Sequence, residues 1–117
     1  MRKNITNIKD SDIQEGDIIL WSWNGMSGEM TYDLTEVKNR CGEKLKFNVR
    51  TLGTTYKHGN TNFLFDISHY LDNESFDILK IIKKSSELHK NILELYVRNE
   101  KGDSEDIFRK LFPELLI

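Results

Sequence analysis

The chain contains one cysteine and three histidines, the side chains most often used in nucleophilic catalysis and metal binding. Cys41 follows Arg40, and a basic neighbour favours the reactive thiolate form of a cysteine. A cysteine nucleophile also needs a base, and the sequence does not indicate which of His58, His69 and His89 would supply it. The spacing of the four residues fits no zinc motif. The sequence therefore predicts a protein without catalytic residues, metal or other cofactor.

Charged side chains are segregated along the chain, which suggests surfaces of opposite sign. Acidic residues outnumber basic ones in the first 36 positions, and basic residues outnumber acidic ones over 37–58. Over 66–77 there are four acidic residues and no Lys or Arg. The predicted partner-binding patch comprises Asp66, Asp72, Glu74 and Asp77. The alternative surface, a nucleic-acid-binding face, comprises Lys38, Arg40, Lys44, Lys46, Arg50 and Lys57. Pairing of opposite charges between neighbouring strands would give both sets a structural role instead.

These blocks favour two functions. Acidic patches can occupy the basic groove of a nuclease, and complementary charge speeds the encounter. The sequence therefore predicts a small non-enzymatic inhibitor that blocks a protein partner with a basic surface, such as a defence nuclease or a toxin. The absence of alanine and the many Ile, Asn and Lys residues are typical of A/T-rich coding DNA and indicate a low-GC bacterium, or a phage or mobile element living in one, as the source. The alternative is nucleic-acid binding by the basic face of residues 44–51, with Tyr56 and Trp23 stacking on bases; the net charge of −2 weighs against it.

A dense apolar run at residues 17–23 is the element that the rest of the chain must surround. The turn Glu15-Gly16-Asp17 precedes it, because Gly tolerates the positive φ of a tight turn and Asp can bond nearby backbone. The residues that follow are apolar on both alternating faces, which is typical of a central strand. We therefore expect a core strand in which Trp21 is largely buried.

Apolar alternation predicts four further strands, over residues 29–39, 44–51, 61–67 and 76–83, of which the first and the last also fit a helix. A polar loop is expected over 53–60. The period then changes, and an apolar stripe that includes Ile92 and Leu95 predicts a helix beginning near Ser86 and ending at Gly102, with His89 facing water. A second helix is expected from Asp103-Ser104 to Pro113.

About five strands followed by two helices predict the α+β class, and tight turns between strands favour a small, partly open SH3-like or OB-like barrel. The chain is expected to be one domain, with a β-rich barrel over 1–84 and the helices over 85–117. No apolar run approaches the roughly 20 residues of a membrane span. The start of the chain lacks the apolar stretch of a secretion signal, and one cysteine cannot form an internal disulfide. These features predict a cytoplasmic protein that does not contact membranes.

Two short segments resemble known families. Residues 16–21 are similar to a strand of the NlpC-like cell-wall peptidases, in which a catalytic cysteine precedes that strand and a histidine lies on the next one. Here Cys41 follows the strand, and residues 29–39 hold no histidine. Circularly permuted relatives place the histidine before the cysteine, whereas His58 comes after Cys41, so the peptidase assignment is declined. Residues 13–18 are similar to a segment of uncharacterised phage proteins called YopX, which implies no mechanism.

Overall fold

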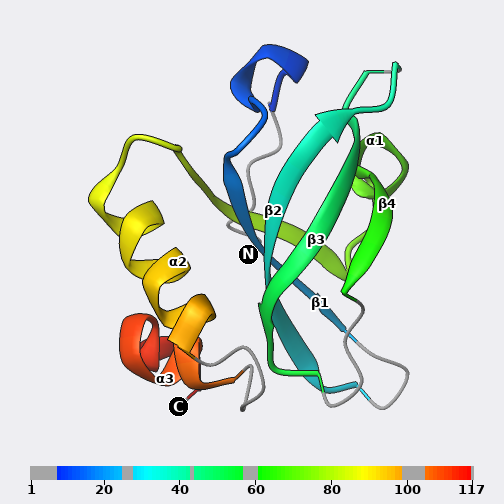
Figure 1. The fold of residues 1–117 in the computed structure, drawn as a ribbon. Coiled ribbons are helices and arrows are strands. Elements are labelled where there is room, and N and C mark those ends of the chain that lie inside the picture. The colour runs from blue at the N-terminus through cyan, green and yellow to red at the C-terminus, as the bar shows by residue number, and fades with distance from the viewer. Residues whose placement is uncertain (1–7, 25–27, 43, 57–60, 99–104, 117) are drawn as a thin grey trace.

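The computed structural model describes residues 8–24, 28–42, 44–56, 61–98 and 105–116 (Figure 1). The strands are β1 (Ile18–Asn24), β2 (Met30–Arg40), β3 (Lys46–Thr54), β4 (Asn62–Asp66) and β5 (Phe76–Ile82). The helices are α1 (Ile67–Tyr70), α2 (Glu87–Arg98) and α3 (Asp106–Leu111), with short 3₁₀ turns η1 (Asp10–Asp12) and η2 (Pro113–Leu116). The predicted α+β class is confirmed.

The strands form one antiparallel sheet in the order β4-β3-β2-β1-β5. Strands β1 to β4 follow one another as a meander, and β5 returns to the free side of β1. Strands β4 and β5 are thus the two edges, and within the described ranges no ladder joins them. The sheet is not closed, so the barrel type expected from the sequence is not confirmed.

Strand β1 has the internal place that its apolar run predicts, since β2 and β5 flank it. Ile18 and Leu20 are buried on one face and Ile19 on the other. Trp21 packs against the core but is less completely buried than Ile19, because its ring borders an open pocket. The pairing of β1 with β5 shifts register between Leu20 and Trp21, because β5 carries one extra residue, Leu79, at this point.

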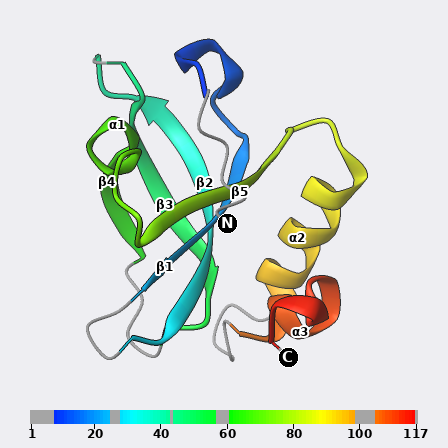
Figure 2. The same ribbon diagram turned by 180° about the vertical axis from the view of Figure 1, so that it is seen from behind.

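Both faces of the sheet carry a hydrophobic cluster. Helices α2 and α3 lie together on one side in both views (Figure 1, Figure 2). The buried residues of this helix-side cluster are Ile18, Leu20, Leu34, Leu52, Ile82, Ile92, Leu95, Ile107, Phe108 and Phe112. The cluster on the opposite face, the cleft-side cluster, includes Ile8 and Ile13, which flank η1, and Ile67 of α1. Its buried residues are Ile8, Ile13, Ile19, Val37, Leu45, Phe47, Val49, Phe65, Ile67, Phe76 and Ile78.

Several element boundaries differ from the predicted ones. The segments 29–39 and 76–83, whose apolar residues fit both a strand and a helix, form the strands β2 and β5. Strand β3 continues to Thr54, so the expected loop over 53–60 begins later; Gly53 and Thr54 pair with β2 beyond a register shift. The expected strand over 61–67 ends at Asp66, because Ile67 turns into α1 to reach the core. The helix boundaries expected at 102–104 lie outside the described residues.

Helix α2 begins where expected, with the backbone N–H of His89 donating to Ser86 Oγ at 3.2 Å. His89 itself is 6% exposed, and its Nε2 lies 2.6 Å from the carbonyl oxygen of Gly16. The prediction that it faces water is wrong, because the turn before β1 covers the first turn of α2. Gly16 has the expected positive φ, 94°. No helix in the part of the chain that the structure describes is long and apolar enough to cross a membrane.

Candidate functional site

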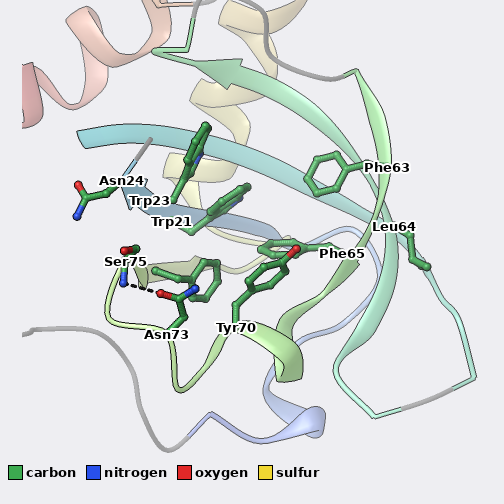
Figure 3. A pocket seen from close by; sticks show the side chains of 10 residues that line it. Trp21, Trp23, Asn24, Phe63, Leu64, Phe65, Tyr70, Asn73 and Ser75 are labelled. Atoms are coloured by element: carbon green, nitrogen blue, oxygen red, sulfur yellow. Dashed lines mark hydrogen bonds between the residues drawn. The ribbon is translucent and has the colours of Figure 1, made fainter. Parts of the chain in front are cut away.

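An open cleft lies on the cleft side of the sheet, away from α2 and α3 (Figure 3). It encloses about 270 Å³. Its walls come from β1, β4, α1, the start of β5 and the connection before it; the lining residues are Trp21, Trp23, Asn24, Phe63, Leu64, Phe65, Tyr70, Asn73, Ser75 and Phe76. The cleft therefore occupies the gap that a ladder between the edge strands β4 and β5 would otherwise close.

Trp21 is the centre of the aromatic lining. Its ring centroid lies 4.8 Å from that of Phe65, 5.6 Å from Phe76 and 6.4 Å from Phe63. Tyr70 adds a fifth ring, 5.4 Å from Phe76. Figure 3 shows Trp21, Phe65 and Tyr70 among the rings that line the cleft, and the Phe65 and Tyr70 rings lie 6.4 Å apart. Tilted rings at these separations are mutually attractive, so the lining is a preformed apolar surface.

Strand β2 holds both indoles of β1 in place. Trp21 Nε1 donates to Thr35 Oγ1 at 2.9 Å, and Trp23 Nε1 donates to Asp33 Oδ2 at 2.6 Å. The outer face of Trp23 meets Tyr56, with ring centroids 5.3 Å apart. Because each indole N–H has a partner beneath the cleft, the ring faces are presented in one orientation.

Asp33 is a buried carboxyl beneath this aromatic surface. Burial raises its pKa above the usual 3.8, while hydrogen bonds from Thr54 and Trp23 act in the opposite direction without cancelling the effect. These two donors are neutral, so they stabilise the charged form less than an ammonium or guanidinium group would. Folding therefore favours the protonated form of Asp33.

The polar rim of the cleft is fixed by the turn that enters β5. Asn73 Oδ1 accepts a hydrogen bond from the backbone N–H of Ser75 at 2.8 Å (Figure 3). The backbone of Phe76 donates to the Asn73 carbonyl at 3.1 Å, and that of Asn24 donates to the Ser75 carbonyl at 3.0 Å. The rim thus combines an Asx-type turn with the end of β1, a rigid frame for a polar contact.

Three of the four acidic residues predicted as a partner patch lie along the segment that frames the cleft. Asp66 ends β4, and Asp72 and Glu74 are exposed in the α1–β5 connection, interleaved with cleft-lining residues. Asp66 accepts a hydrogen bond from Ser68 Oγ at 2.8 Å. Asp77 lies within β5 next to Phe76, and alternation along a strand places it on the helix side of the sheet.

The predicted basic face is partly engaged in structural contacts. Arg40 pairs with Asp10 at 2.7 Å and lies over the ring of Phe47. Arg50 pairs with Glu36 of β2 at 2.6 Å and lies over the ring of Tyr96 of α2. Of the others, Lys38 and Lys44 are exposed, Lys46 is half-buried, and Lys57 lies outside the described residues. Opposite charges are thus paired across the sheet at Arg50, as one of the two sequence interpretations expects.

The histidines and the cysteine stay separate. Cys41 is exposed, His89 is buried against Gly16, and His69 packs edge-on against Tyr70 at 5.1 Å. His58 lies outside the described residues. Among the residues that the structure describes, no group of three or more His, Cys, Asp or Glu side chains is arranged to hold a metal ion.

Of the residues that line the cleft, the sequence singles out Trp23 as a surface for stacking and Trp21 as part of the core strand. Phe63 and Phe65 are expected only as part of the strand over 61–67, and no pattern assigns a role to Tyr70 or Asp33. The available signal was the density of rings over 63–76, where four aromatic residues follow one another closely. Their convergence with Trp21 depends on the return of β5 to β1, which local patterns do not reveal.

Comparison of this chain with protein-family models, curated proteins and solved structures gave no match. Pockets for drug-sized ligands usually enclose about 300–1,000 Å³. A cleft of about 270 Å³ with a polar rim suits a smaller group, such as one apolar side chain of a protein.

Proposed function

We propose that this protein is a non-enzymatic binding protein that holds an apolar or aromatic side chain of a partner protein in the aromatic cleft. The observation that carries the proposal is the open, ring-lined cleft with its indoles hydrogen-bonded in place. Interfaces usually derive most of their binding energy from a few aromatic anchors in well-packed pockets. A preformed cleft avoids the entropic cost of ordering those anchors on binding.

The charges around the cleft support a basic partner. Asp66, Asp72 and Glu74 occupy the segment that frames it, and complementary charge speeds association. As the biological role we infer an inhibitor of the phage or mobile-element type that blocks a basic protein surface, such as that of a defence nuclease or a toxin. The order β4-β3-β2-β1-β5, with the last strand beside the first, supports an open SH3-like barrel as the scaffold.

The Trp23–Tyr56 ring pair supports a second candidate function, the binding of single-stranded nucleic acid. Tyr56 is 45% exposed and packs at an interplanar angle of 54° against Trp23, so a base could stack on its exposed ring. The ion pairs of Arg40 and Arg50 reduce the positive charge that this function would use. We therefore rank it below capture of a protein side chain.

Substitution of two tyrosines of similar exposure distinguishes these two functions. Tyr70 lines the cleft and is 40% exposed, whereas Tyr56 contacts Trp23 outside the cleft lining. Short random peptides displayed on phage are selected on the full chain, and the best binder is synthesised and titrated calorimetrically. We expect Tyr70→Ala to weaken binding about tenfold or more, and Tyr56→Ala to change it about twofold at most.

The matched titration uses a single-stranded oligothymidine at low salt. If the protein binds nucleic acid, Tyr56→Ala weakens that interaction and Tyr70→Ala leaves it unchanged. Peptides that bind Tyr70→Ala as tightly as the wild type would contradict the cleft function. Melting curves of both variants establish that each is folded.

A further inference from the structure

Hydrogen bonds at both ends of β4 determine which way its backbone groups point. The N–H of Thr51 donates to the Thr61 carbonyl at 2.9 Å, just before β4. The N–H of Ile67 donates to the Leu45 carbonyl at 2.9 Å, just after it. In an antiparallel ladder, hydrogen-bonded pairs recur at every second residue. Positions 63 and 65 of β4 therefore bond to β3, while positions 62 and 64 direct their N–H and C=O groups away from it.

Leu64 occupies the middle of this outward edge. Its register partner, Asn48, forms a non-hydrogen-bonded pair with it, and no described residue bonds to the backbone of Leu64. The Leu64 side chain is 49% exposed. Natural sheets usually cover or block such an edge, because unpaired N–H and C=O groups are a template for another strand.

The free edge of β4 borders the aromatic cleft. Phe63, Leu64 and Phe65 all line the cleft, and Phe76 of the other edge strand lies across it. In Figure 3, Phe63 and Phe65 point into the cleft while Leu64 points away from it. An extended segment beside β4 would enter the gap between the edge strands, and alternate side chains of that segment would face the rings.

We propose that the partner binds by strand addition: a basic, extended segment pairs with the free edge of β4 and inserts one apolar side chain into the cleft. This inference rests on the proposed function and specifies the form of its ligand. Backbone pairing supplies affinity, and the cleft supplies selectivity for the inserted side chain. Asp66 at the end of β4, with Asp72 and Glu74 beyond it, selects Lys or Arg beside that side chain.

Two substitutions at one position test the backbone contact. Leu64→Pro removes the outward N–H but leaves the ladder with β3 intact, because that N–H is not part of it. Leu64→Thr removes the same apolar side chain and keeps the N–H. With the synthetic peptide selected from the phage library, we expect Leu64→Thr to bind within about threefold of the wild type and Leu64→Pro to bind about tenfold more weakly or worse.

Amide exchange provides a second measurement on the unaltered protein. Strand addition slows exchange of the Leu64 N–H when the peptide is bound, as followed by NMR. Peptides N-methylated at alternate backbone positions cover the case in which Leu64→Pro does not fold. One alternating register of methylation should abolish binding, and the other should preserve it, because only one set of amides faces β4.

The outcomes separate the two proposals. If binding requires Tyr70 but neither methylation register nor Leu64→Pro affects it, and the Leu64 amide is not protected, strand addition is overturned and the cleft function stands. If the peptide binds regardless of Tyr70, the proposed function itself fails. A library that yields no binder contradicts both.

Discussion

Two almost fully buried aspartates beside β1 differ in what surrounds them. Asp17 lies at the start of the strand, its closed end, and Asp33 lies beside residues 21–24, the cleft-lining half of the strand or cleft end. Asp17, 2% exposed, immediately precedes β1, and Asp33, 6% exposed, lies opposite Trp21 on β2. The Asp17 carboxylate receives hydrogen bonds from Lys83 Nζ at 2.9 Å and from the backbone N–H groups of Gln14 and Lys84 at 2.9 and 3.1 Å. Within the described ranges, the hydrogen-bond donors to Asp33 are the neutral side chains of Trp23 and Thr54.

Their pKa values shift in opposite directions. Burial alone would raise the pKa of Asp17, but the hydrogen bonds from Lys83, Gln14 and Lys84 outweigh it and hold that pKa below 3.8. Burial prevails at Asp33 and raises its pKa. The closed end of β1 thus uses a compensated charge to join the lead-in, β1 and the segment after β5. The cleft end instead holds the Asp33 carboxyl, whose charged form is destabilised by burial, and groups with shifted pKa values are common at binding sites.

The largest effect is expected at the closed end. Asp17→Ala removes an acceptor for Lys83 and for two backbone amides, so it should lower the free energy of unfolding by ~4 kcal/mol in urea titrations. Asp12→Ala is the control: in the part of the chain that the structure describes, its exposed carboxylate accepts a hydrogen bond from the nearby Lys9 N–H, and its loss should cost about 0.5 kcal/mol or less. If both variants lose the same free energy of unfolding, the hydrogen bonds of Asp17 do not stabilise the closed end more than an exposed contact does.

Trp21→Ala tests how much the cleft end contributes to the fold. Trp21 packs against Phe65 and Phe76 but remains partly exposed, so truncation should cost ~3 kcal/mol, at the lower end of the range for buried aromatic residues. Urea titrations measure this, and Trp23→Ala, nearer the rim, is the comparison. A variant that unfolds at the wild-type urea concentration would show that the aromatic lining does not support the sheet.

A third test exchanges each buried carboxyl for an amide. Folding favours the neutral form of Asp33, so its contribution to stability is complete below the unfolded pKa, near 3.8, and is lost as pH rises through the raised folded pKa. Asp33→Asn should therefore melt a few degrees above the wild type at pH 7, and the difference should shrink as pH falls toward 3.8. Thermal melts across this range measure it.

Asp17→Asn should show the opposite sign. The lowered pKa of Asp17 contributes stability above 3.8, and this is lost as pH falls through the folded pKa. The amide variant should melt below the wild type at pH 7, with a gap that narrows in acid. If both amide variants shift the melting temperature in the same direction, the contrast between the two aspartates is wrong.

The smallest effect on stability is expected from the acids that frame the cleft. Asp72→Asn combined with Glu74→Gln should change the free energy of unfolding by about 0.5 kcal/mol or less, because both residues are exposed. The same variant should associate severalfold more slowly with a basic peptide in stopped-flow measurements, and with a weaker dependence on salt. Glu114→Gln is the control for loss of a negative charge elsewhere. An unaltered association rate would show that these acidic residues belong to a solvated turn and do not contact the partner.

Local patterns in the sequence determined much of the sheet and of α2. The apolar run after Gly16 predicted an internal strand, and apolar alternation predicted the strand over 44–51, in which Phe47 and Val49 are buried. The stripe with Ile92 and Leu95 predicted α2 and its buried side. These features depend on side-chain periods of two and 3.6 residues, which neighbouring positions specify by themselves.

Tertiary structure alone decided the features on which the proposed function rests. The cleft exists because β5 returns to β1 and leaves β4 as a free edge, so rings distant in sequence converge on Trp21. His89 is buried because the Gly16 turn covers it, and Asp33 is buried because β3 continues to Thr54 beyond a register shift. Burial, and with it the pKa of a carboxyl or the exposure of a ring, depends on what long-range pairing places over a residue. No periodicity within a single segment encodes that information.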